Sequence, residues 1–200
     1  PRLVQLREQV RTQEPDWHNA PVASFGSLDA ELLIVGLAPG RGGANRTGRP
    51  FTGDYAGDLL YQTIEKFGLS EGRYGAGPDD GLRLRNCRIT NAVRCLPPEN
   101  KPVGAEIKEC GAYLAEEIGA MGRLRVLLAL GVVAHGAVLT VLGQRKSLFK
   151  FSHGAQHQLP SGLVLADSYH CSRYNTNTRR LTVDMFESVF EGLAGLLPRS

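Results

Sequence analysis

The chain has 200 residues, of which 42% are hydrophobic, and a formal net charge of +3. This size and apolar content suit one globular domain, which we expect to span residues 1–200. The longest apolar stretch, residues 126–142, contains Gly131 and His135 and is shorter than the ~20 residues that a membrane span needs. With no signal-peptide pattern at the start, these features disfavour a membrane protein and predict a cytoplasmic one.

Apolar runs alternate with segments of helical spacing along the chain. In chain order we expect a helix (1–13), a strand (32–35), a long loop (36–54), a helix (57–67), a surface loop (70–81), a strand (84–93), a proline-bearing loop (94–102), a helix (104–121), a strand (125–130), a helix (132–142), a strand (163–167), a polar loop (168–178) and a helix (183–197). Strands separated by helices predict a three-layer α/β/α sandwich with a central, mainly parallel four-stranded sheet.

The loop over residues 36–54 combines many glycines with three arginines in nine residues, at positions 41, 46 and 49. Glycine lets the backbone approach a ligand closely, and arginine binds phosphate. The loop lacks the Gly-Lys-Ser/Thr sequence of a P-loop, and its length breaks the dinucleotide-binding fingerprint. The loop therefore predicts a binding site, but not one for the phosphates of a nucleotide cofactor.

Three loops with polar side chains follow expected strands, at residues 36–54, 91–95 and 169–175. The carboxyl ends of parallel strands meet at one edge of a sheet, where ligands bind. Each side chain also has a structural interpretation by itself. Asn91 fits a buried structural amide, His170 a structural histidine, and Asp54 a cap of the following helix. The convergence of the three loops favours a site.

Several segments resemble motifs of the family 5 (UDGb-type) uracil-DNA glycosylases, over nearly the whole chain. The sequences GLAPG (36–40), NRTG (45–48) and PFTGD (50–54) are similar to the first motif of that family, and SYHCS (168–172) to its second. TNAVRCLPP (90–98) and FSHGA (151–155) match further family segments. The family usually has proline after the histidine, where this chain has Cys171, so we expect a looser loop there.

The resemblance implies a monofunctional DNA repair glycosylase that flips uracil out of DNA, hydrolyses its N-glycosidic bond and leaves an abasic site. It implies that Phe51 stacks on the base and Asn91 binds its polar edge. Backbone groups near Leu37 and Ala38, together with His170, would donate to the oxygen that becomes negative. Asp54 would polarise water or stabilise the cationic sugar. The apolar side chain of Leu37 cannot discriminate between bases by hydrogen bonding. We therefore expect hypoxanthine and other deaminated bases as further substrates.

We expect the DNA contacts on the two long loops. Arg173 and Tyr174 are expected to enter the minor groove and fill the gap that the flipped nucleotide leaves. The further candidate DNA contacts are Arg46, Arg49, Asn175, Arg179 and Arg180. We expect a monomer in the bacterial or archaeal cytoplasm, associated with the nucleoid.

Two of the four cysteines, Cys95 and Cys110, correspond to ligands of a 4Fe-4S cluster in the resembling family. The other two ligands are expected in a Cys-x-x-Cys upstream of Pro1. From the residues alone, the cysteines of a cytoplasmic chain are metal ligands or inert thiols. Cys87 and Cys171 are not expected to replace the upstream ligands.

Two other functions remain open on the sequence. One is a catalytically silent protein that binds damaged DNA, and the other is a hydrolase of free nucleotides. The presence of both Asp54 and His170 favours an enzyme over a silent binder. The basic loop over residues 173–180 favours a polymeric substrate over a free nucleotide.

Overall fold

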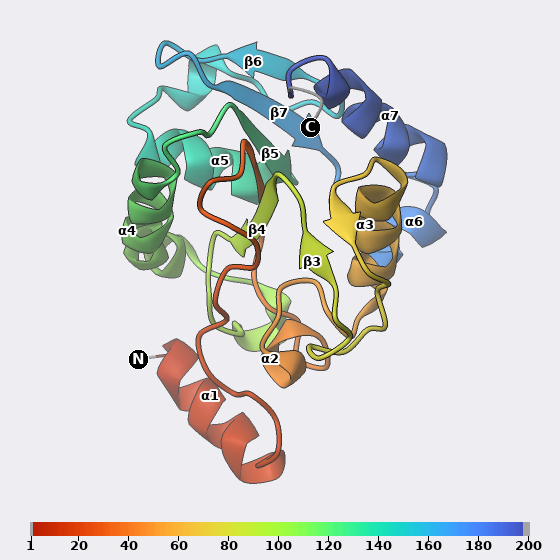
Figure 1. Ribbon diagram of the computed structural model, residues 1–200. Coiled ribbons are helices and arrows are strands. Elements are labelled where there is room, and N and C mark those ends of the chain that lie inside the picture. Colours follow the sequence, from red (N-terminus) through yellow and green to blue (C-terminus); the bar gives the residue numbers. More distant parts are fainter. Residues whose placement is uncertain (1, 198–200) are drawn as a thin grey trace.

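The computed structural model describes residues 2–197, and its centre is a five-stranded sheet in the order β4-β1-β5-β7-β6 (Figure 1). The four parallel strands are β1 (Leu32–Gly36), β4 (Cys87–Asn91), β5 (Val126–Leu130) and β7 (Val164–Ser168). The fifth strand, β6 (Gln156–Gln158), pairs antiparallel with β7 at the edge. The mainly parallel sheet is confirmed, but its strand number is five rather than four. Edge strand β6 was missed because its three residues are polar and show no apolar alternation.

Helices cover both faces of the sheet, which confirms the three-layer sandwich (Figure 1). On one face, α3 (Tyr55–Lys66) and α7 (Val183–Ala194) pack on a cluster that includes Ile34 and Leu128. On the other face, α4 (Gly104–Ala120) and α5 (Val132–Val141) pack on Leu33 and Leu127. Strands buried on both faces explain why β1 and β5 are continuous apolar runs.

Shorter elements divide the segments that we expected to be loops. The loop after β1 contains α2 (Ala44–Thr47), and the loop after β7 contains α6 (Arg173–Asn177). The expected strand over residues 84–93 is interrupted, because the chain turns at Asn86 with φ +48°. Its first part, β3 (Arg83–Leu84), pairs instead with β2 (Ser70–Glu71). Two 3₁₀ helices, η1 (Pro98–Asn100) and η2 (Lys146–Leu148), lie in the remaining connections.

The N-terminal helix α1 (Arg2–Gln13) lies apart from the sheet and contacts η1 (Figure 1). Arg2 forms an ion pair with Glu106 at the start of α4, with 2.8 Å between Nε and Oε1. This ion pair holds α1 beside the segment that carries Cys95 and Cys110. Among residues 2–197, no helix combines the length and the apolar character that crossing a membrane requires.

Candidate active site

A cavity of about 1020 Å³ opens at the carboxyl ends of the parallel strands. Its walls come from the glycine-rich loop after β1, the start of α5 and the loop after β7. The predicted site residues among its lining are Leu37, Ala38, Asp54, His170, Arg173, Asn175 and Arg180. The position agrees with the rule that ligands of open α/β sheets bind outside the carboxyl ends of the strands.

Phe51, Asn91 and His170 come together beside this cavity, although they belong to three separate segments. The rings of Phe51 and His170 stack, with centroids 5.8 Å apart and an interplanar angle of 28°. Phe51 and Asn91 both lie against Gly36, where a Cβ atom would collide with the Phe51 ring and with Oδ1 of Asn91. Glycine is therefore required at the end of β1 so that the aromatic ring and the amide can meet.

The Oδ1 atom of Asn91 is buried and has no hydrogen-bond partner among the described residues. A buried acceptor without a partner costs about 1–3 kcal/mol, so native proteins rarely leave one unsatisfied. Asn91 lies at the last position of β4, in register with Gly36 of β1. An unpaired acceptor at a strand end, next to an aromatic ring, points to a ligand that donates a hydrogen bond.

Asp54 both caps a helix and lines the cavity, so the two interpretations of this residue are compatible. Its Oδ1 accepts a hydrogen bond from the backbone N–H of Gly57 at 3.2 Å, at the start of α3. Its Oδ2 lies against Gly43, where a Cβ atom would collide with it. Burial raises the pKa of Asp54 above its ordinary value, although backbone N–H groups of Ala56 and Gly57 oppose the rise.

His170 is a partly buried, neutral imidazole that lines the cavity. Burial lowers its pKa to about 4, because the charged form loses its hydration. The Nδ2 group of Asn175 donates to the backbone carbonyl of His170 at 2.8 Å, and Oγ of Ser172 accepts from the backbone N–H of Asn175. Asn175, expected to contact DNA, therefore also fixes the loop that carries the histidine.

Cys171, at the position where we expect a looser loop, packs against α3. Its side chain is fully buried, and Sγ donates to the carbonyl oxygen of Ala56 at 3.4 Å. Burial raises the pKa of this thiol, which keeps it protonated. A buried thiol in contact with α3 anchors the segment in place of the restricted φ of proline.

The predicted DNA-contacting residues differ in their placement. Arg46 is exposed, and Tyr174, with 72% of its surface accessible, extends from α6 into solvent. Arg173 lies over the ring of Tyr55, with 5.4 Å between Cζ and the ring centroid. Arg180 lies over the ring of Tyr169 in the same way, at 4.7 Å. Of these residues, Arg173 and Arg180 line the cavity, whereas Arg46 and Tyr174 do not. Arg179 is also exposed and has φ +57°.

The expectation that Arg49 contacts DNA is wrong, because its side chain is not available to a phosphate. It is buried and forms two hydrogen bonds of 2.7 Å to the carboxylate of Asp80. Its guanidinium also lies 5.0 Å from the ring centroid of Phe25. Sequence proximity to two other arginines suggested a phosphate contact, but the carboxylate partner lies 31 residues away and gave no local signal.

Two apolar residues at the start of α5 line the cavity but were not among the predicted site residues. They are Val132 and Val133. Both are unusually accessible for valine, at 61% and 38%. The sequence predicts only that they begin a helix over residues 132–142. Their position directly after Gly131, at the end of β5, is the signal that places them at the site edge of the sheet.

All four cysteines are free thiols. Burial and the neighbouring Cys110 thiol raise the pKa of Cys95, whereas Arg7 of α1 opposes the rise. Cys95 and Cys110 are thus neighbours beside α1. Cys87 donates instead to the carbonyl of Leu69, away from this pair. The other two described cysteines, Cys87 and Cys171, are fully buried and hydrogen-bond to the carbonyl oxygens of Leu69 and Ala56.

Comparison with known proteins identifies the family of this chain. The family described as the uracil DNA glycosylase superfamily matches residues 23–194. A protein of Thermus thermophilus named Type-5 uracil-DNA glycosylase is 46% identical over 205 residues, covering 98% of this chain and 93% of its own length. Proteins of the same name from Mycobacterium leprae and Pyrobaculum aerophilum are 41% and 40% identical, over 98% and 97% of this chain and 90% and 86% of their own lengths.

Proposed function

Because the chain belongs to the uracil DNA glycosylase superfamily, we propose that it is a monofunctional DNA repair enzyme that hydrolyses the N-glycosidic bond of uracil in DNA. The observation that carries this proposal is the meeting of Phe51, Asn91 and His170 beside a cavity at the sheet edge. An aromatic ring, an unpaired amide acceptor and a neutral imidazole are the groups that recognition and release of a pyrimidine require.

The reaction needs the base outside the DNA helix, since protein groups cannot surround it within the stack. The ring of Phe51 would support the flipped uracil. The unpaired Oδ1 of Asn91 would accept the hydrogen of the uracil imide nitrogen, which satisfies the buried acceptor. A base without that N–H leaves the acceptor unpaired, so this contact selects among bases.

Breaking the bond leaves negative charge on uracil and positive charge on the sugar. Neutral His170 would donate a hydrogen bond to the uracil oxygen, together with backbone groups near Leu37 and Ala38 that line the cavity. Losing one such donor costs about 3–4 kcal/mol of transition-state stabilisation in enzymes. The Oδ2 atom of Asp54 would then polarise the attacking water or stabilise the cationic sugar. The bond to uracil breaks, the water oxygen bonds to the sugar, and the proton that this water loses neutralises the uracil anion, so that free uracil and an abasic site remain.

We further propose that the enzyme accepts hypoxanthine and other deaminated bases. The cavity of about 1020 Å³ is large for a single pyrimidine, and Leu37 contributes an apolar wall. An apolar wall discriminates weakly between bases that differ in polar substituents.

Arg173 and Tyr174 follow each other in the short helix α6; Arg173 lines the cavity and Tyr174 is exposed. We propose that they occupy the minor groove behind the flipped nucleotide, with Arg46, Arg179 and Arg180 on the phosphates. Asn175 remains a candidate contact alongside its role in the loop. The proposed setting is the bacterial or archaeal cytoplasm, with DNA as the partner.

We also propose that Cys95 and Cys110 hold part of a 4Fe-4S cluster. Such a cluster is bound by four thiolates, and the adjacent pair provides two of them. Its contribution would be structural, because the pair lies between α1 and the segment that follows Asn91. The roles proposed for His170, Asp54 and the backbone groups of the cavity do not involve the cluster.

The function is tested with duplex DNA that contains one labelled uracil, under single-turnover conditions with the full chain. We expect cleavable abasic sites from the wild-type protein and from Lys108→Ala, an exposed control on α4. Asn91→Ala should lose at least a hundredfold in rate.

Binding without release of uracil would support a silent binder, and comparable hydrolysis of free deoxyuridine would support a nucleotide hydrolase. A hypoxanthine duplex tests the broader substrate range.

A further inference from the structure

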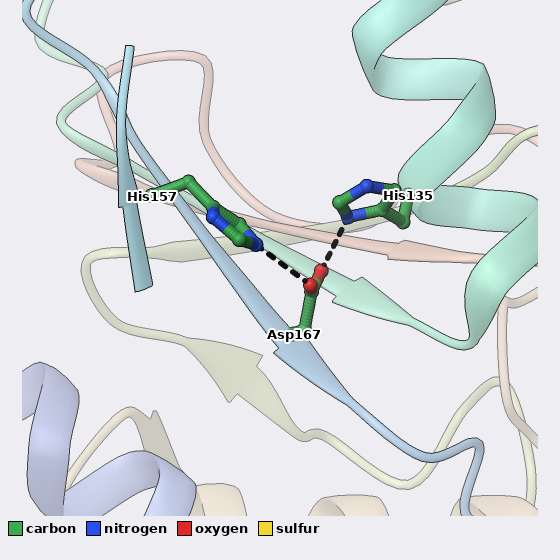
Figure 2. Close-up of side chains that lie close together, drawn as sticks. All are labelled: His135, His157 and Asp167. Atoms are coloured by element: carbon green, nitrogen blue, oxygen red, sulfur yellow. Dashed lines mark hydrogen bonds and ion pairs between the residues drawn. The ribbon is translucent and has the colours of Figure 1, made fainter. Parts of the chain in front are cut away.

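Three metal-ligating side chains meet beside the sheet, outside the lining of the large cavity (Figure 2). His135 comes from α5, His157 from edge strand β6, and Asp167 from β7. His135 Nδ1 lies 2.7 Å from Oδ1 of Asp167, and His157 Nε2 lies 3.1 Å from Oδ2. One ligand atom from each residue lies within 4.8 Å of the others.

The carboxylate of Asp167 is fully buried, and its ion-pair partners in the described chain are these two histidines. A buried carboxylate is unstable unless positive charge and hydrogen bonds compensate for its lost hydration. His135 is also almost fully buried, whereas His157 is partly accessible. The backbone N–H of Ser152 donates to Oδ2 at 3.4 Å, and the remaining compensation, a proton or a cation, lies within this cluster.

The hydrogen bonds of His135 show where that charge lies. Its Nε2 is 2.9 Å from the carbonyl oxygen of Phe149, which only accepts, so Nε2 carries a hydrogen. In a neutral imidazole, Nδ1 then presents a lone pair toward the Asp167 carboxylate. Two lone pairs at 2.7 Å repel, so a cation must lie between them. That cation is either a proton or a metal ion.

We propose that His135 Nδ1, His157 Nε2 and a carboxylate oxygen of Asp167 bind a divalent transition-metal ion of the Zn²⁺ class. Two imidazoles and one carboxylate form a donor set that such ions prefer. A histidine that binds a metal usually donates its other N–H to a carbonyl or carboxylate, as His135 does to Phe149. Ligand atoms of a tetrahedral zinc site lie about 3.4 Å apart, so small side-chain shifts complete the site.

The surroundings of the cluster suit such an ion. The rings of Phe149 and Phe151 pack edge-on against His157 and His135 and provide an apolar wall. Of the three side chains, that of His157 is the most accessible. An ion there joins α5 and the edge strand β6 to β7. Since β7 leads to His170 three residues after Asp167, the ion stabilises the scaffold of the histidine loop.

The test is equilibrium dialysis of the full chain against Zn²⁺ at pH 7.5, with bound metal counted by mass spectrometry. Cys95 and Cys110 also bind zinc, so the measurement is the difference between variants. We expect His157→Gln to bind one ion fewer per chain than the wild type, or to bind that ion at least tenfold more weakly. His18→Gln, a histidine near Gly48 and away from the cluster, is the matched control and should bind like the wild type.

Equal zinc content in the wild type and His157→Gln would overturn the proposal and leave a proton as the compensating cation. X-ray absorption of the zinc-loaded wild type gives a second readout that needs no variant. Nitrogen and oxygen scatterers with an imidazole signature support the site, whereas sulfur scatterers alone assign the metal to the cysteines and contradict it. Circular dichroism of His157→Gln confirms that the compared chains are folded.

Discussion

The side-chain amide of Asn175 holds the backbone of His170 in place, through a hydrogen bond of 2.8 Å from Nδ2 to the histidine carbonyl. The two residues lie five positions apart, on either side of Ser172, which caps the short helix α6. The bond fixes the carbonyl of the residue whose imidazole stacks on Phe51. Asn175 therefore acts on the reaction through the position of His170.

Asn175→Ala is expected to lower the single-turnover excision rate about tenfold or more, because misplacement of a donor by a fraction of an ångström weakens its effect. Loss of one hydrogen bond should lower the free energy of unfolding by only about 1 kcal/mol. Rate measurements at saturating enzyme, with urea unfolding, check both values. Thr178→Ala, which removes another side-chain hydrogen bond at the end of α6, is the control and should keep most of the rate.

Asn91→Ala should separate stability from activity. Its buried Oδ1 has no partner, so removing the amide also removes an uncompensated acceptor. We expect the free energy of unfolding to stay within about 1 kcal/mol of the wild type, while excision falls at least a hundredfold. Chemical denaturation and excision assays measure the two effects. A large loss of stability would instead identify Asn91 as a structural amide and contradict its proposed role in base binding.

The pKa of Asp54 should determine the pH below which the excision rate falls. Burial raises its pKa, and the nearby Asp58 carboxylate adds to the rise, so Asp54 takes up a proton at a higher pH than an ordinary aspartate. The carboxylate form is the one that polarises water or stabilises a cation. Excision should therefore fall as the pH drops through this raised pKa. His170 stays neutral until the pH reaches about 4, so it titrates at the acidic end of the profile.

Asp54→Asn keeps the oxygen that caps α3 but cannot ionise. We expect a rate at least tenfold lower, with a pH profile that lacks the limb due to Asp54. Asp58→Asn should retain the acidic limb, moved to a slightly lower pH, because it removes a neighbouring negative charge. An Asp54→Asn enzyme with the wild-type rate and profile would remove Asp54 from the mechanism and leave only its capping role.

The sequence predicts well which side chains meet at one edge of the sheet when they stand at strand ends. Asn91 and His170 come after apolar strands, so parallel topology alone brings them to one edge. Partners that are distant in sequence and carry no local pattern could not be predicted. Asp80, which binds Arg49, lies in a polar loop, and the strand β6 that carries His157 has no apolar alternation. Such contacts depend on tertiary packing, which overrides local charge and periodicity.

Arg49 and Arg46 lie three residues apart, but their substitutions should change different properties. Replacing Arg49 should lower stability, and replacing Arg46 should weaken DNA binding. Arg49 is buried and bonded to Asp80 through both guanidinium ends, and this bond holds the pKa of Asp80 well below its usual range. Removing one partner of a buried ion pair costs about 3–5 kcal/mol. Arg49→Ala should therefore lower the free energy of unfolding by that amount, and Arg49→Ala with Asp80→Ala should lose less than the sum of the two single changes.

Arg46 is exposed, and its Nε donates to the carbonyl of Gly42 at 2.8 Å, which leaves the rest of the guanidinium free for a phosphate. Arg46→Ala should leave stability within about 0.5 kcal/mol of the wild type. It should also reduce the slope of log K against log salt by about one unit, because one phosphate contact is lost. Fluorescence anisotropy with uracil-containing duplex at several salt concentrations measures that slope. An unchanged slope would show that Arg46 makes no phosphate contact and that the backbone of the loop alone approaches the DNA.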